Sequence, residues 1–178
     1  PKLAWQVSGL GTGYLSVSIQ NGRLFTMGDI GADQFVIALS LDTKAILWKT
    51  KIGPAWTEDR YAGPRGTPTA DGAVVYAIGT EGALMAIEAA TGKVRWQKSL
   101  PGDFGGNVMS GWKWSESPLV DGDRLVVTPG SSSALLVCLE KATGKEIWRT
   151  KAGEMGALGR DGAGYSSVVV SNGAGVKQ

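Results

Sequence analysis

The residues best suited to binding chemistry lie in or beside three segments of the chain, at about 52–66, 100–115 and 152–164. Each segment separates groups of short apolar runs and combines aromatic side chains with charged ones. Aromatic and arginine side chains dominate the energetics of protein interfaces. We therefore predict a surface for a protein or peptide partner, and the alternative is that these side chains only pack the segments down. The candidates are Trp56, Arg60, Tyr61, Arg65, Trp112, Lys113, Trp114, Glu116 and Arg160.

Catalytic and metal-binding chemistry has few carriers in this sequence. There is no histidine and one cysteine, Cys138, so the chain can form neither an internal disulfide nor a zinc site of Cys and His ligands. The usual histidine general base is absent too, which leaves Asp, Glu, Lys or a bound cofactor. The glycine-rich segments 9–13 and 159–164 lack the spacing of a dinucleotide-binding loop. We predict no catalytic residue, no metal ligand and no cofactor.

A motif that ends in tryptophan recurs along the chain. In each copy an apolar run of four residues leads to a turn, and a threonine in that turn precedes the tryptophan by five residues. The tryptophans follow one another at steps of 96 − 48 = 48 and 148 − 96 = 52. A ligand site is rarely repeated in this way, so we expect each indole to wedge between neighbouring repeats and to bury roughly 150–250 Å². The predicted docking residues are Trp5, Trp48, Trp96 and Trp148.

Two positions in the aligned copies vary. Cys138 takes the place of Ala38 and Ala86, which predicts a small apolar slot rather than a reactive thiol. Lys44 stands where the other copies have glycine, so its turn is expected to differ.

A second mark repeats with nearly the same period. Asn-Gly or Asp-Gly pairs begin at residues 21, 71, 121 and 172, at steps of 50, 50 and 51. These pairs favour the positive φ angles of tight hairpin turns. With short apolar runs on either side, they indicate strands rather than helices.

Each repeat is therefore expected to form four strands, and such a unit of about 40–50 residues is a propeller blade. The predicted fold is all-β, a β-propeller of four-stranded antiparallel blades. Complete blades are expected at about 14–51, 66–99 and 115–151, with partial strands at 1–8 and 165–178. Closed propellers need roughly four to eight blades. We therefore expect the remainder of a longer chain, or self-association, to complete the ring.

The repeats resemble a known family. Residues 86–96, Ala-Ile-Glu-Ala-Ala-Thr-Gly-Lys-Val-Arg-Trp, and residues 138–148 are similar to the tryptophan-docking motif of PQQ-like, quinoprotein-type propellers. The outer-membrane assembly lipoproteins have propellers of this type. The resemblance implies a periplasmic or otherwise exported protein. For the catalytic members it also implies PQQ and Ca²⁺, but their adjacent cysteines are absent here and their metal ligands match no position.

Three functions remain open at this point. The first is a non-catalytic scaffold that binds a protein or peptide through the blade-connecting loops. The second is a portion of a PQQ- and Ca²⁺-dependent dehydrogenase, and the third is an extracytoplasmic sensor domain. The net charge of +2 and the absence of a basic run argue against a nucleic-acid partner. No apolar run is long enough to span a membrane.

Overall fold

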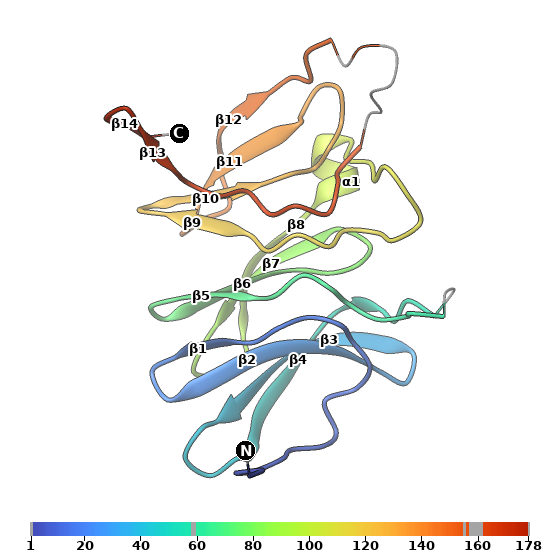
Figure 1. The fold of residues 1–178 in the computed structure, drawn as a ribbon, viewed down its shortest axis with the longest axis vertical. Coiled ribbons are helices and arrows are strands. Elements are labelled where there is room, and N and C mark those ends of the chain that lie inside the picture. The colour runs from blue at the N-terminus through green and yellow to red at the C-terminus, as the bar shows by residue number, and fades with distance from the viewer. Residues whose placement is uncertain (1, 58–59, 155, 157–161, 178) are drawn as a thin grey trace.

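The computed structural model describes residues 2–57, 60–154, 156 and 162–177, and it consists of antiparallel sheets stacked on one another (Figure 1). Three sheets have four strands each, in chain order, and we call them blades 1, 2 and 3. Blade 1 comprises β1 (Ser18–Gln20), β2 (Arg23–Ile30), β3 (Asp33–Ser40) and β4 (Ile46–Pro54). Blade 2 comprises β5 (Thr69–Asp71), β6 (Val74–Ile78), β7 (Ala83–Glu88) and β8 (Val94–Ser99). Blade 3 comprises β9 (Leu119–Asp121), β10 (Arg124–Val127), β11 (Leu136–Glu140) and β12 (Glu146–Thr150). The predicted all-β class with four-stranded antiparallel blades is confirmed.

The hairpins between the first two strands of each blade begin at the repeated Asn/Asp-Gly pairs. Asn21 and Gly22 both have positive φ, at 49° and 71°, as a tight turn requires. In blades 2 and 3 the glycine of the pair has φ near +60°. The pair at 172–173 behaves differently from the prediction. It forms the short strand β13 (Asn172–Gly173), which pairs with β14 (Val176–Lys177), and the turn lies at Ala174 and Gly175.

Residues 2–8, expected to be a strand, form none in the structure. A strand needs a hydrogen-bonded neighbour, and no described strand of another blade lies beside this segment. Val7 and Leu10 instead pack against the outer face of blade 1, on Leu24, Ile37 and Leu39. The segment thus covers apolar surface without joining a sheet.

The core lies between successive blades. One cluster joins blades 1 and 2 and includes Phe25, Val36, Val75 and Ile87. A second cluster joins blades 2 and 3. Because side chains alternate across a strand, blade 2, in the middle, contributes one set of residues to each cluster.

Equivalent residues form a row across each sheet, and the tryptophan stands at its end. The three rows are Phe25–Ala38–Trp48, Tyr76–Ala86–Trp96 and Val126–Cys138–Trp148. Cys138 is fully buried in this place, and burial raises the pKa of its thiol.

Two of the four predicted docking tryptophans bridge neighbouring blades. Trp48 Nε1 donates to the Ala89 carbonyl at 3.1 Å, and Trp96 Nε1 donates to the Lys141 carbonyl at 3.0 Å. Gly92 and Gly144 lie against these indoles, and a Cβ at either glycine would come within 2.8 Å of the ring. Each glycine therefore lets the indole of the preceding blade approach closely.

The other two tryptophans are more exposed. Trp148 is 38% exposed and Trp5 is 44% exposed. Lys44 Nζ lies 5.0 Å from the centroid of the Trp5 ring. Lys44 itself has φ of +60°, close to the +77° and +73° of Gly92 and Gly144. The expected difference in this turn is thus one of side chain, and the left-handed backbone is retained.

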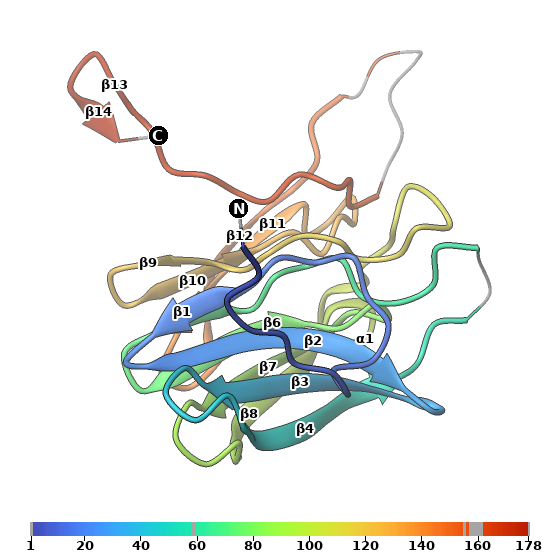
Figure 2. The same ribbon diagram turned by 60° about the horizontal axis from the view of Figure 1, so that its bottom comes forward.

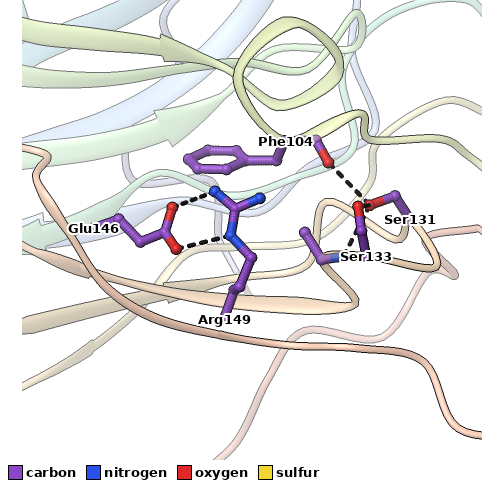
Figure 3. A network of polar contacts seen from close by, with 6 residues as sticks. Phe104, Ser131, Ser133, Glu146 and Arg149 are labelled. Atoms are coloured by element: carbon purple, nitrogen blue, oxygen red, sulfur yellow. Dashed lines mark hydrogen bonds and ion pairs between the residues drawn. The ribbon is translucent and has the colours of Figure 1, made fainter.

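A short helix fastens blade 2 to blade 3. α1 (Leu100–Phe104) begins after Ser99, whose hydroxyl accepts from the Gly102 N–H. Ser131 Oγ donates to the Phe104 carbonyl at 2.9 Å, and the Arg149 guanidinium lies 5.4 Å from the Phe104 ring centroid (Figure 3). Glu146 forms an ion pair with Arg149 and orients it. These contacts form where the chain leaves blade 2.

The segments that lead into β1, β5 and β9, and the segment beyond blade 3, are joined by a chain of hydrogen bonds from backbone N–H to side-chain hydroxyl. We call it the hydroxyl ladder, and its residues are Ser16, Thr67, Ser117 and Ser167. Ser16 N donates to Thr67 Oγ1 at 3.2 Å, Thr67 N to Ser117 Oγ at 3.0 Å, and Ser117 N to Ser167 Oγ at 2.8 Å. Each step spans 50 or 51 residues. The hydroxyls of Thr67, Ser117 and Ser167 therefore each accept from the backbone of the residue one repeat earlier.

Candidate functional site

The described parts of the blade-connecting segments lie on one side of the stack, opposite the hairpin turns that join the first two strands of each blade (Figures 1 and 2). Arg65 lies among three aromatic rings there. Its Cζ is 4.8 Å from the Trp56 ring centroid, 4.6 Å from that of Trp112 and 5.8 Å from that of Tyr14. A guanidinium over an aromatic face gains roughly 0.5–2 kcal/mol for each contact. We call these four residues with Tyr61 the arginine–aromatic cluster.

Tyr61 extends this cluster toward solvent. Its ring stacks on Trp112, with centroids 6.1 Å apart and planes at 20°, and meets Tyr14 edge-on at 5.9 Å. Arg60 Cζ lies 5.7 Å from the Tyr61 ring. Tyr14, Tyr61 and Trp112 are 57%, 44% and 38% exposed, so large aromatic faces remain open to solvent. The cluster thus combines a stacked interior with an exposed outer surface.

Arg65 is also held by the backbone of its own loop. Nη2 donates to the Tyr61 carbonyl at 2.6 Å, and Nη1 donates to the Gly63 carbonyl at 3.3 Å. Gly63 has φ of +105°, and a Cβ there would come within 2.7 Å of the Thr12 carbonyl oxygen. A glycine is required here because the loop crosses the segment before β1 so closely.

A buried polar network anchors both loops to blades 1 and 2. The Gln34 side chain is fully buried, donates to Asp29 Oδ1 at 2.8 Å and accepts from Thr80 N at 2.9 Å. Asp29 Oδ2 accepts from Trp56 N at 2.9 Å. Thr80 O in turn accepts from Trp114 N at 3.3 Å. One glutamine thereby fixes the start of the first loop and the end of the second.

An open cavity of about 390 Å³ adjoins the cluster. It is lined by Arg65, Trp112, Ser115 and Tyr165, and we call it the Arg65 pocket. Tyr165 Oη is hydrogen-bonded to Ser110 Oγ, which joins the last segment of the chain to the loop after α1. The pocket is therefore formed by the connections that enter blade 2, blade 3 and the segment beyond blade 3.

Several predicted partner-binding residues lie elsewhere than expected. Trp114 and Glu116 are only 6% and 2% exposed, so they cannot meet a partner at the surface. Trp114 packs in the core between blades 2 and 3, against Gly82. Lys113 forms an ion pair with Glu81 at 3.0 Å. Arg160 lies outside the described residues.

Glu116 has an unusual electrostatic setting. Its Oε1 accepts from Thr128 N at 2.7 Å, and its buried Oε2 has no hydrogen-bond partner. Burial raises the pKa of this carboxyl to about 7, although the Thr128 N–H acts in the opposite direction. The charged form is penalised because the interior solvates it poorly.

Several residues of the site are not among the candidates predicted from the sequence. Tyr14, Ser115 and Tyr165 line the cluster or the pocket, and Asp29 and Gln34 hold the loops in place. Tyr14 and Tyr165 share the context Gly-Tyr-x-Ser before the turn, which is a signal for equivalent positions at the site. Gln34 has no such signal, because its burial depends on the loop that folds over it.

Comparisons with known proteins agree with this architecture. The family model described as outer membrane protein assembly factor BamB matches residues 2–97, 32–130 and 106–173, in three overlapping windows. No curated protein sequence matches the chain.

Solved structures share the fold. A europium-containing methanol dehydrogenase is 19% identical with a TM-score of 0.63, and the match covers 86% of this chain and 27% of the enzyme. The quinohemoprotein alcohol dehydrogenase from Comamonas testosteroni is 18% identical with a TM-score of 0.58, over 85% of this chain and 23% of the enzyme. The computationally designed Ika4 protein is 9% identical with a TM-score of 0.58, over 94% of this chain and 86% of that one.

This chain spans about a quarter of the length of either dehydrogenase. The three blades are thus part of what those larger proteins contain, whereas the family model accounts for nearly the whole sequence. The chain belongs to the PQQ-like β-propeller repeat family described as outer membrane protein assembly factor BamB.

Proposed function

We propose that the chain is a section of a non-catalytic propeller scaffold that binds a protein or peptide partner through its blade-connecting loops. The observation that supports this most is the exposed Tyr61–Trp112 stack around Arg65. Tyrosine, tryptophan and arginine are the residue types enriched at binding hot spots. A surface prearranged in this way spends little conformational entropy when a partner docks.

The support beneath the loops favours binding over catalysis. Asp29 holds the loop that follows blade 1, because each of its carboxylate oxygens accepts one hydrogen bond. Oδ2 accepts from Trp56 N and Oδ1 accepts from the Gln34 side chain. The Lys113 ammonium group forms an ion pair with Glu81. The polar groups thus position the aromatic surface.

A PQQ- and Ca²⁺-dependent activity has weaker support. Calcium takes six to eight oxygen ligands, with carboxylates prominent among them. In the part of the chain that the structure describes, no three acidic, histidine or cysteine side chains gather in one place. The residues of these three blades therefore do not fit such a metal site.

We further propose a periplasmic or otherwise exported location, on the basis of family membership. Within the described residues no helix has both the length and the apolar character needed to cross a bilayer.

Site-specific photo-crosslinking tests the scaffold proposal. A benzoylphenylalanine would replace Tyr61 or Trp112 in the protein expressed in its native envelope, and Leu47, an exposed apolar residue on the outer strand β4, would be the control position. We expect discrete crosslinked products from positions 61 and 112 and none from position 47.

Two outcomes would contradict the proposal. One is that positions 61 and 112 give no product, or only the products obtained from Leu47. The other is stoichiometric PQQ and Ca²⁺ binding with turnover of an alcohol or sugar, lost when residues of this chain near the pocket are changed.

A further inference from the structure

The Arg65 pocket has a charged group with unused donors. A guanidinium carries five N–H donors. In Arg65, two of these donate to the carbonyls of Tyr61 and Gly63. Trp56 and Trp112 lie over the guanidinium, at 4.8 and 4.6 Å from its Cζ. The stacking and the two carbonyls fix the position of the group, and three of its N–H groups remain for a ligand of the cavity that Arg65 lines.

No described carboxylate forms an ion pair with this arginine. Among the acids that the structure describes, Asp29 holds Trp56 N and Gln34, and Glu81 pairs with Lys113. Glu116 is buried, and its raised pKa of about 7 leaves much of it uncharged near neutral pH. Arg60 adds a second cation beside Tyr61. The described rim of the pocket is therefore positive.

The surroundings of the pocket are apolar. Trp112 and Tyr165, which line it, are 38% and 48% exposed. The cavity of about 390 Å³ exceeds the space of one carboxyl group and suits two or three neighbouring side chains. A ligand that fits would carry one negative charge between apolar groups.

We infer that the Arg65 pocket binds an aspartate or glutamate side chain on an extended segment of the partner, with apolar side chains beside it resting on Trp112 and Tyr165. This rests on the proposed function. The planar guanidinium offers a carboxylate paired N–H donors, which makes such pairs both strong and geometrically selective. The flanking apolar contacts distinguish a peptide from a free small acid.

Fluorescence anisotropy with two labelled, capped peptides tests this inference on the intact chain. The peptides are Gly-Phe-Glu-Phe-Gly and Gly-Phe-Gln-Phe-Gly, which differ only in the charge of the central side chain. We expect the Glu peptide to bind at least about tenfold more tightly, and the difference to shrink as salt is raised. In Arg65→Gln the two affinities should become equal.

Matched variants keep the test decisive. Arg95→Gln removes an arginine of the outer strand β8, paired with Glu88 and distant in sequence from every pocket residue, and should retain the full preference. Arg65→Lys keeps the charge but loses the planar fork, and should reduce the preference several-fold. If Arg65→Gln fails to fold, this variant and the two peptides on the unmodified protein still decide.

Three results would overturn the inference. They are equal affinity for both peptides, a Glu preference that survives Arg65→Gln, and no saturable binding of the Glu peptide up to about 1 mM. Acetyl-glutamate amide that competes as well as the Glu peptide would overturn the extended segment as the occupant. Any of these combined with crosslinks at positions 61 and 112 leaves the scaffold function standing, whereas loss of those crosslinks removes both.

Discussion

At the scale of single residues, Glu116 makes the stability of this protein depend on pH. In the unfolded chain its carboxyl titrates near its ordinary pKa of 4.5, and in the folded chain burial raises that pKa to about 7. The protonated form is favoured by folding, so its stabilising contribution is complete below pH 4.5. It is lost as pH rises from there through 7. The total change is roughly 3 kcal/mol.

Chemical denaturation between pH 4 and 8 would measure this. We expect Glu116→Gln, which keeps an acceptor for Thr128 N, to remove most of the decline of unfolding free energy across that window. Glu154→Gln, at an exposed glutamate, should leave the decline in place. A Glu116→Gln protein with the same pH profile as the unmodified one would show that Glu116 is solvated in solution.

Glu116 also marks a limit of reading residues from sequence. It follows two aromatic residues in a polar segment, and that context predicts exposure. Two residues later Pro118 begins the approach to β9, and the chain has already turned inward, so the carboxyl is buried against the backbone of Thr128. Trp112 and Trp114 illustrate the same limit: one is 38% exposed and the other 6%, although the local sequence treats them alike.

At the scale of elements, the docking tryptophans should differ in energetic weight although they share one motif. Trp96 packs against Tyr76, with ring centroids 6.1 Å apart, lies over Gly144 and donates to the Lys141 carbonyl. Trp148, at the same place in blade 3, is 38% exposed. We expect Trp96→Ala to lower the free energy of unfolding by about 3–5 kcal/mol, and Trp148→Ala to lower it by less than half as much.

Urea unfolding followed by far-ultraviolet circular dichroism would compare the two variants. Trp96→Phe keeps an aromatic ring but loses the indole N–H and part of the ring area, and we expect it to cost at least about 1 kcal/mol, the value of the hydrogen bond to the Lys141 carbonyl, but less than Trp96→Ala. Equal losses for Trp96→Ala and Trp148→Ala would mean that the wedge position carries no more weight than a half-exposed ring.

The elements themselves were predictable because local signals agreed with one another. Turn glycines, short apolar runs and the repeated Thr-to-Trp spacing all point to the same four strands per repeat. The structure differs from the prediction in segments whose conformation depends on pairing with another strand. Residues 2–8 carry a tryptophan motif but have no described neighbouring strand, and the turn after Ser171 moves by two residues from the Asn-Gly pair. The packing of α1 against Arg149 depends on a contact between segments that are distant in sequence.

At the scale of the whole molecule, the described blades form a stack in which blade 1 shares a core cluster with blade 2, and blade 2 shares another with blade 3. Stability in such arrays is approximately a sum of repeats and of the interfaces between them. The hydroxyl ladder is one term of each interface, and it lies next to the site. Arg65 precedes Thr67 by two residues and Ser115 precedes Ser117 by two. The hydrogen bond from Thr67 N to Ser117 Oγ therefore fixes the spacing of two sides of the Arg65 pocket.

The ladder leads to a prediction that a packed core alone would not make. Ser117→Ala leaves the Thr67 N–H without its acceptor, and we expect a cost of about 1 kcal/mol together with faster hydrogen exchange at the Thr67 amide. The amide of Val75, which lies inside blade 2, should keep its protection because its own sheet is untouched. Ser117→Thr retains a hydroxyl at this place, as blade 2 does with Thr67, and should restore both properties. The Thr67 amide could instead exchange at the same rate in the alanine variant. In that case the blades are held together here by their apolar contacts. The loops that carry Arg65 and Ser115 would then owe their spacing to the buried Gln34 network.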